Sequence, residues 1–185
     1  MPDEWAGSEH IMSLLKRLFG NAEPDPKSKL VPLYNQIVAK ARLPHWYVEG
    51  QVPDSIDGRF DMVAAILTLV LLRLEEDKAR GQDMAHLTEV FVDDMDGQLR
   101  EVGIGDMIVG KHMGRIMGAL GGRLGAFREA MKDNAKLDDV ILRNIYRSEA
   151  ADVAALAHVR QSLLDVERAL ASQLPEMIVE GTAKW

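Results

Sequence analysis

The apolar run from Met62 to Leu72 constrains the fold more than any other feature of this chain. Only Thr68 interrupts the run, and charged residues flank it on both sides. A helix that crosses a membrane needs about 18 or more consecutive apolar residues, so this run is too short for one. Its length fits a buried core helix better.

Apolar residues at helical spacing continue along most of the chain, and no stretch shows the alternation of a strand between hairpin turns. The pattern predicts helices over residues 28–41, 57–81, 83–103, 110–131, 138–146 and 153–174. We expect Asp57 and Asp83 to cap the second and third of these helices. Gly81 and Gly103 are expected to end the same two helices. The chain is therefore predicted to be all-α, with one compact multi-helix domain over residues 28–185.

Residues 1–27 differ from that domain and are expected to form an arm and a linker. A short amphipathic helix is predicted over residues 8–19, where apolar side chains at helical spacing and two cations occur; these are Ile11, Leu14, Leu15, Leu18, Lys16 and Arg17. One interpretation is peripheral contact with the inner membrane through Leu14, Leu15 and Leu18, with about 1 kcal/mol added by each cation at an anionic surface. The other is a frayed terminus, or an arm that docks on the domain.

Composition and charge exclude several classes of function. The 185 residues are 47% hydrophobic and 28% charged, and the formal net charge is −7. Bulk binding to nucleic acid needs a basic face, so no nucleic-acid partner is expected. The absence of cysteine excludes disulfides, thiolate metal sites and cysteine nucleophiles. Acids near the N-terminus and the lack of a long apolar stretch there do not resemble a secretory signal, so we expect a cytoplasmic protein.

Residues 105–112 have the spacing of a phosphate-binding loop without meeting its requirements. His112 follows Lys111 where a Ser or Thr hydroxyl is needed for magnesium, and a predicted helix precedes the segment instead of a strand. The five histidines fall at no metal-ligand spacing, and no nucleophile motif occurs. We therefore expect no catalytic residue, no metal and no cofactor, and predict that the protein is not an enzyme.

Three aspartates lie within residues 93–96 and form an acidic run. A calcium loop that has Gly97 at its sixth position would need ligands from Val92 and Gly103, and neither has a side-chain oxygen. A solvated or ion-paired helix face explains the aspartates, with Arg100 placed for a favourable i,i+4 ion pair. An acidic patch that binds a partner and a metal-dependent helical enzyme that uses these carboxylates are the alternatives.

A row of glycines recurs at every fourth position of the predicted helix over residues 110–131; these are Gly110, Gly114, Gly118 and Gly122. Each glycine inside a helix costs about 0.8–1 kcal/mol relative to alanine. The row covers a band of roughly 120° around the helix, a flat strip that lets another helix approach closely. We expect a neighbouring helix of the same chain on this strip. The alternatives are a groove for a partner helix, a homodimer that associates through the strip, and a break at Gly121 and Gly122.

Four short blocks of sequence carry a resemblance to a known family. They are Val-Pro-Asp-Ser-Ile-Asp-Gly-Arg-Phe at 52–60, Asp-Met-Asp at 94–96, Leu-Arg-Glu-Val-Gly-Ile-Gly-Asp at 99–106 and Gly-Arg-Leu at 122–124. Together and in this order, they resemble the ubiquinol–cytochrome c chaperone family, the assembly chaperones of the cytochrome bc1 complex. The segment from Leu33 to Arg42, Tyr47, and Leu-Arg-Asn-Ile-Tyr at 142–146 fit the same pattern. The sequence departs from the family in its fourth predicted helix, where glycines stand in place of longer or aromatic side chains.

The resemblance implies an all-α protein without catalytic activity that binds a client polypeptide. In the mitochondrial members the client is newly made cytochrome b, and a small assembly factor is a further partner. Because no mitochondrial presequence precedes the first block, the chain is expected to be a bacterial member. The alternative function is a homodimeric helical scaffold or adaptor that associates through its glycine-rich helix face.

Charged residues near the predicted helix ends and turns are the candidate partner-binding residues; these are Asp57, Arg59, Asp94, Asp96, Arg100, Asp106, Lys111 and Arg123. If the arginines are buried against aspartates, they hold the fold together, because breaking a buried pair costs about 3–5 kcal/mol. If they lie exposed around an apolar groove, they form the rim of a recognition surface. Helix capping already explains Asp57 and Asp106. Trp46, Tyr47 and Phe60 are candidates for exposed aromatic anchors.

Overall fold

The computed structural model describes residues 25–101, 106–149 and 151–185, and every regular element in these ranges is helical. The α-helices are α2 (Val31–Ala41), α3 (Ile56–Glu75), α4 (Gly81–Glu101), α5 (Asp106–Lys132), α6 (Leu137–Asn144), α7 (Val153–Ala171) and α8 (Pro175–Val179). Short 3-10 helices connect or precede them; they are η1 (Pro26–Leu30), η2 (Pro44–Trp46), η3 (Lys78–Arg80) and η4 (Asn134–Lys136). The predicted all-α fold is confirmed.

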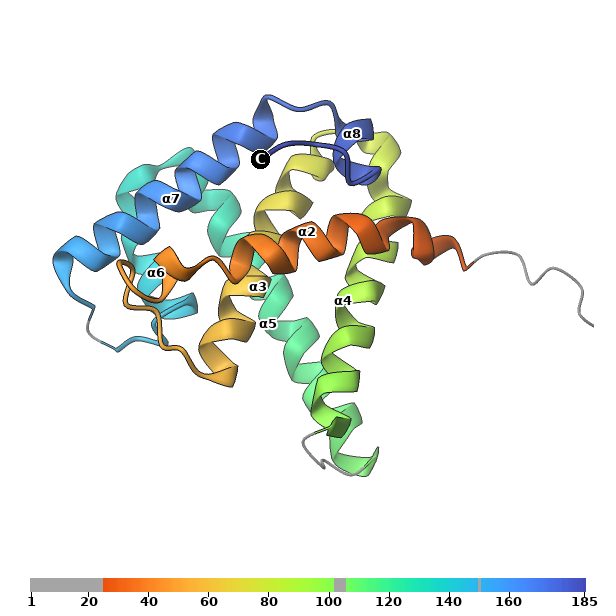
Figure 1. The fold of residues 1–185 in the computed structure, drawn as a ribbon, viewed down its shortest axis with the longest axis horizontal. Helices are drawn as coiled ribbons and strands as arrows, with labels where there is room; N and C mark the ends of the chain where they lie inside the picture. Colours follow the sequence, from red (N-terminus) through yellow and green to blue (C-terminus); the bar gives the residue numbers. More distant parts are fainter. Residues whose placement is uncertain (1–24, 102–105, 150) are drawn as a thin grey trace, which may run out of the picture.

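Helix α3 lies at the centre of the fold, with α2 crossing it on one side and α5 on the other (Figure 1). Helices α4 and α7 also contact α3. Residues 61–71 of α3 are all buried, so the apolar run is the buried core helix that the sequence predicts. No helix within the described ranges is long and apolar enough to span a membrane.

The predicted arm, with its amphipathic helix and Leu14, Leu15 and Leu18, lies outside the described residues except for its last three positions. Lys27, the last of these, places its Nζ 2.5 Å from Oδ2 of Asp93. This ion pair joins η1 to α4.

Helix α3 begins and ends at residues other than those predicted. Its N-cap is Ser55, whose Oγ accepts a hydrogen bond from the backbone N–H of Gly58 at 3.1 Å. Asp57, the predicted cap, already lies in the first turn, because the extended backbone needed at a cap occurs two residues earlier. The helix ends at Glu75, and Gly81, the predicted stop, is the first residue of α4.

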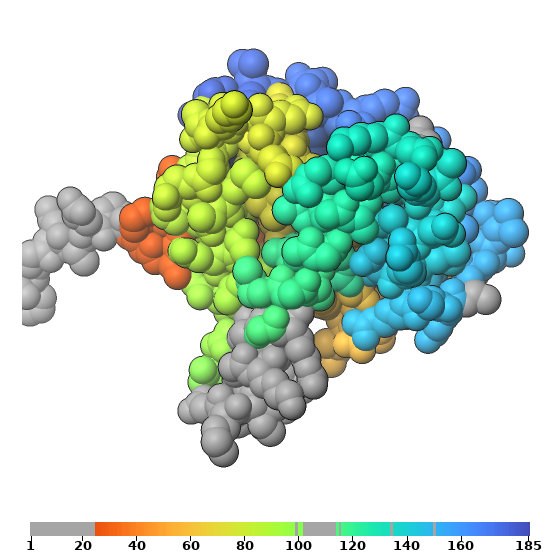
Figure 2. Space-filling model, turned by 180° about the vertical axis from the view of Figure 1, so that it is seen from behind, coloured from red at the N-terminus to blue at the C-terminus, as the bar shows by residue number. Residues whose placement is uncertain are grey.

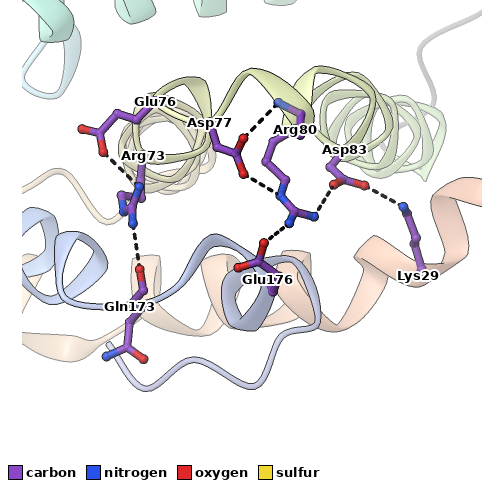
Figure 3. Close-up of polar contacts among 9 residues, drawn as sticks. Lys29, Arg73, Glu76, Asp77, Arg80, Asp83, Gln173 and Glu176 are labelled. Carbon is purple, nitrogen blue, oxygen red and sulfur yellow. Dashed lines mark hydrogen bonds and ion pairs between the residues drawn. The ribbon is translucent and has the colours of Figure 1, made fainter.

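An ion-pair network holds the start of α4 against η1 and α8 (Figure 3). Asp83, the other predicted cap, is buried in the first turn of α4, 2.6 Å from Lys29 Nζ and 3.4 Å from Arg80 Nη1. Arg80 also contacts Asp77 of the preceding turn and Glu176 of α8. The carboxylate of Asp83 therefore joins two chain segments instead of capping a helix, and the network positions α8, which was not predicted.

Helix α5 runs through its glycine row without a break, and the row faces open space. A Cβ atom added to any of its described glycines would meet no atom within 4 Å; these are Gly114, Gly118, Gly121, Gly122 and Gly125. The expectation that a neighbouring helix of the same chain packs on this strip is therefore wrong for these residues. Figure 2 shows the described part of α5 at the surface beside α4. Met117 of the same helix is 42% exposed.

The C-terminal helices follow the predicted pattern with small shifts. Helix α6 begins at Leu137 and ends at Asn144, two residues before the predicted end. Helix α7 buries Val159 and Leu163, as its periodicity indicates, but Val153 at its first position is 84% exposed. The first residue of α7 therefore lies outside the core.

Candidate functional site

The loop between α2 and α3 forms an apolar recess with a charged rim, which we name the α2–α3 recess. Its cavity volume is about 460 Å³, and its lining residues are Arg42, Pro44, Tyr47, Val48, Asp54 and Arg59. Exposed hydrophobic side chains lie in this loop and at its end: Leu43 is 37% exposed, Val48 69%, and Ile56, the first residue of α3, 73%. A group of exposed apolar side chains rimmed by polar residues is typical of a protein-binding site.

Trp46 supports this loop from the interior. Its ring is fully buried, and its Nε1 donates a hydrogen bond to the Lys40 carbonyl at 2.8 Å. The backbone carbonyl of Trp46 accepts a bond from Val52, and that of Gly50 accepts one from the Tyr146 hydroxyl, whose pKa burial raises to about 12. Trp46 is a core residue that fixes the loop, so the prediction that it is an exposed anchor is wrong.

The polar groups of the recess leave one cation without a partner. Tyr47 is half-buried and donates its hydroxyl to the Ala41 carbonyl at 2.9 Å; burial raises the pKa of this tyrosine. Arg59 Nε lies 2.6 Å from Asp54 Oδ1, and both side chains are exposed. No ion pair joins Arg42 to any other described residue. The recess therefore presents an apolar wall with an uncompensated positive charge beside it.

Two histidines join the loop to α7. Nδ1 of His45 lies 3.0 Å from Nε2 of His158, and the His45 ring lies 4.4 Å from the Trp46 ring, measured between centroids. Burial lowers the pKa of His45, and the neighbouring His158 lowers this pKa further. Glu49 raises the pKa of His45, and Lys40 lowers it. Because one ring must donate and the other accept, the bond is lost when both rings are protonated.

We expect this pair to make the fold less stable in acid. A histidine with a lowered pKa in the folded chain takes up its proton mainly on unfolding. The free energy of unfolding is therefore highest above the ordinary pKa of 6.5 and falls with decreasing pH, by at most about 1.4 kcal/mol per pH unit for each proton. Urea titrations between about pH 7.5 and 5.5 measure this slope. It should decrease in His45→Gln; equal slopes in wild type and His45→Gln would contradict the assignment.

Arg123 belongs to a buried ion-pair group in the core and not to a surface. Its Nη2 contacts Oδ1 of Asp61 and donates to the Asn144 carbonyl at 2.9 Å. Arg147 Nε lies 2.6 Å from Oδ2 of the same Asp61, and its Nη1 lies 2.8 Å from Asp57. Asp61 is 1% exposed and Arg123 7%; burial lowers the pKa of Arg123, and Asp61 opposes that change. The sequence left two roles open for Arg123, a buried ion pair that holds the fold together or an exposed position on a recognition rim. The structure shows the buried ion pair.

Phe60 lies beside this group and does not line the recess. Its ring centroid is 5.9 Å from that of Phe91, and the Arg123 guanidinium lies 5.5 Å from the Phe60 ring. Half-buried in this position, Phe60 stabilises the packing of α3, α4 and α5 and is no exposed anchor.

The aspartates of α4 are occupied by contacts within the chain. Asp94 accepts hydrogen bonds from the Tyr34 hydroxyl at 2.6 Å and from Gln98 at 3.0 Å. The pKa of Tyr34 is raised, mainly by burial and also by its hydrogen bond to Asp94. Asp96 lies 2.7 Å from Arg100, which is the i,i+4 pair that the sequence predicts. Within the described ranges, no three His, Asp or Glu side chains come close enough together to hold a metal ion.

The predicted site residues thus do not form one surface. Tyr47 and Arg59 come together in the α2–α3 recess, while Arg123 lies in the core. Asp106 and Lys111 lie on α5, and their side chains are outside the described part of the chain.

Sequence reasoning missed the two charged recess residues Arg42 and Asp54 and the exposure of Val48. An apolar residue between two prolines, away from any helical stripe, is the signal that could have found Val48. The burial of Asp61 could also have been predicted. This acid directly precedes the apolar run that forms the buried helix, and a buried acid needs a partner.

Comparison with known proteins agrees with this architecture. The family described as ubiquinol-cytochrome C chaperone matches residues 48–185. The fold is similar to a solved structure, the crystal structure of the Cbp3 homolog from Brucella abortus, with a TM-score of 0.74 and 29% sequence identity over 95% of this chain and 96% of that chain. No curated protein matches the chain. Because the family match extends from the α2–α3 loop to the last residue, the chain belongs to the ubiquinol-cytochrome C chaperone family.

Proposed function

We propose that the protein is a non-catalytic chaperone that binds cytochrome b during assembly of the ubiquinol–cytochrome c reductase (cytochrome bc1) complex. Membership of the chaperone family supports the general role. The observation that carries the binding mode is the α2–α3 recess, where Val48 is 69% exposed. Ile56, at the start of α3 directly after the same loop, is 73% exposed. In this proposal the protein acts in the cytoplasm, and contact of Leu14, Leu15 and Leu18 with the membrane surface remains a prediction.

In this proposal the recess receives an apolar side chain of the client. The side chain contacts Pro44, Tyr47 and Val48, and burial of one large apolar side chain contributes about 1.5–3 kcal/mol. Arg42 and Arg59 at the rim provide donors for client carbonyl or carboxylate groups. A partner-binding role remains a prediction for the other exposed or undescribed candidates; these are Asp57, Asp94, Asp96, Arg100, Asp106 and Lys111.

Site-specific crosslinking tests the proposal. A photo-crosslinking amino acid at Ile56 is expected to capture epitope-tagged cytochrome b in cells that assemble the complex. Val48→Asp places a charge on the apolar wall and should lower the yield at least about fivefold, the effect of losing an important contact residue. Val153→Asp is the matched control, because Val153 is even more exposed but lies outside the recess. Equal yields in the two variants, or no capture of cytochrome b by folded protein, would refute the proposal.

The second candidate is a homodimeric scaffold, which the uncovered glycine row of α5 favours. Leucine at Gly114 or Gly118 would fill the strip and prevent close approach of a partner helix. Analytical ultracentrifugation of the wild type, Gly114→Leu and Gly118→Leu tests it. A wild-type monomer at high concentration would exclude this candidate.

A further inference from the structure

A second recess lies between α3, α5 and the end of α7, and we name it the α3–α5–α7 pocket. Its cavity volume is about 370 Å³, and its apolar lining residues are Leu69, Leu72, Met131, Leu170 and Ala171. Leu69 and Leu170 are core residues, whereas Ala171 is exposed at the entrance. The floor of the pocket is therefore the surface of the hydrophobic core itself.

The rim of this pocket carries three cations, and each of them is already neutralised by an acid of the same chain. The pairs are Arg73–Glu76, Arg128–Glu75 and Lys132–Glu129. Arg128 binds both carboxylate oxygens of its partner, at 3.0 and 2.9 Å. Arg73 also donates to the Gln173 carbonyl at 2.8 Å, which ties the end of α3 to the segment after α7 (Figure 3). These contacts hold the pocket walls in place before anything binds.

Glu167 on α7 is the exception among the charged groups of the rim. It is half-buried and lines the pocket, and no ion pair joins it to another described residue. The pocket thus combines an apolar floor with Glu167, the one acid of its described lining that has no ion pair. The net charge of −7 adds to the attraction of a cationic segment at long range.

We propose that the α3–α5–α7 pocket binds a juxtamembrane segment of the client, with an apolar side chain on the floor and a neighbouring Lys or Arg paired with Glu167. This inference rests on the proposed function, in which the client is a membrane protein. The cytoplasmic ends of membrane-spanning helices combine apolar residues with an excess of Lys and Arg, so they have the chemistry that this pocket complements. The α2–α3 recess, where Arg42 is the unpaired charge, takes a different part of the client.

Crosslinking at the pocket entrance tests this assignment. A photo-crosslinking amino acid at Ala171 should capture tagged cytochrome b, and mass spectrometry of the crosslinked peptide should identify a segment at a cytoplasmic helix end that contains Lys or Arg. Glu167→Lys should lower the yield by up to about fivefold, the upper range for a partly exposed ion pair. Glu180→Lys is the control, because it makes the same charge change on an exposed residue outside the pocket and should alter the yield less than about twofold.

The outcomes separate this inference from the proposed function. Capture of cytochrome b at Ile56 but not at Ala171 would overturn the pocket assignment and leave the chaperone function standing. Capture at neither position would overturn both. Crosslinks from Ala171 to residues 8–19 of the same chain, or to a second copy, would show that the client is not the occupant. Equal losses in Glu167→Lys and Glu180→Lys would overturn the pairing with Glu167, because net charge alone would then explain the binding.

Discussion

Replacement of Asp61 by alanine is expected to lower the free energy of unfolding by about 3–5 kcal/mol. Arg123 and Arg147 share this carboxylate, and its removal leaves the Arg123 guanidinium buried without a counter-ion. Arg147 loses less than Arg123 in this variant, because it keeps its ion pair with the exposed Asp57. Urea denaturation followed by far-UV circular dichroism measures the change.

Two further variants distinguish a buried charge from a general loss of packing. Asp54→Ala removes the exposed partner of Arg59 and should leave stability unchanged within error. The double variant Asp61→Leu with Arg123→Met replaces the buried charges by apolar groups and should recover more than half of the loss, because a well-packed apolar pair can substitute for a buried ion pair. A double variant as unstable as Asp61→Ala would contradict this explanation.

Gly58→Ala is expected to destabilise the fold by about 1–3 kcal/mol or more, the range for forcing an atom into a filled space. A Cβ atom at Gly58 would lie 1.9 Å from the Pro53 carbonyl oxygen, which is backbone and cannot rotate away. The loop that forms the α2–α3 recess must therefore move. Thermal and urea denaturation should register the loss of stability, and crosslinking from Ile56 should weaken in the same variant.

Gly118→Ala provides the opposite control on α5. Nothing lies within 4 Å of a Cβ atom at this position, so alanine fits without a clash. Its higher helix propensity should then stabilise α5. The free energy of unfolding should rise by about 0.5–1 kcal/mol. Destabilisation by Gly118→Ala would mean that something packs on this face in solution.

The sequence alone predicts the helical class, the central helix and the family, because these depend on spacing over many residues. It does not predict which loop residue turns inward. Trp46 and Val48 are two positions apart. Trp46 is buried, donates its Nε1–H to the Lys40 carbonyl and accepts a backbone hydrogen bond from Val52, whereas Val48 remains exposed. A contact from a distant part of the chain also holds this loop, because the Tyr146 hydroxyl donates a hydrogen bond to the Gly50 carbonyl.

For the charged residues too, the sequence predicts the position on a helix but not whether the side chain is buried. Asp57 and Asp61 are four residues apart on one face of α3, yet only Asp61 is buried. Arg147, which reaches both, follows α6 in a left-handed backbone conformation with a φ of 54°, and no helical periodicity predicts its position. Similarly, the spacing of the glycines predicts a flat strip on α5, but only the packing of the whole chain determines whether a helix covers it.

The uncovered glycine row also sets where the folded chain opens first. Without side chains over this face, water reaches the peptide groups of α5 directly, and each glycine gains conformational freedom when its turn unwinds. Helix α3 has no such face, because side chains of other helices surround it. Amide hydrogens between Gly114 and Gly122 therefore exchange with solvent through local fluctuations, while those at the centre of α3 wait for global unfolding.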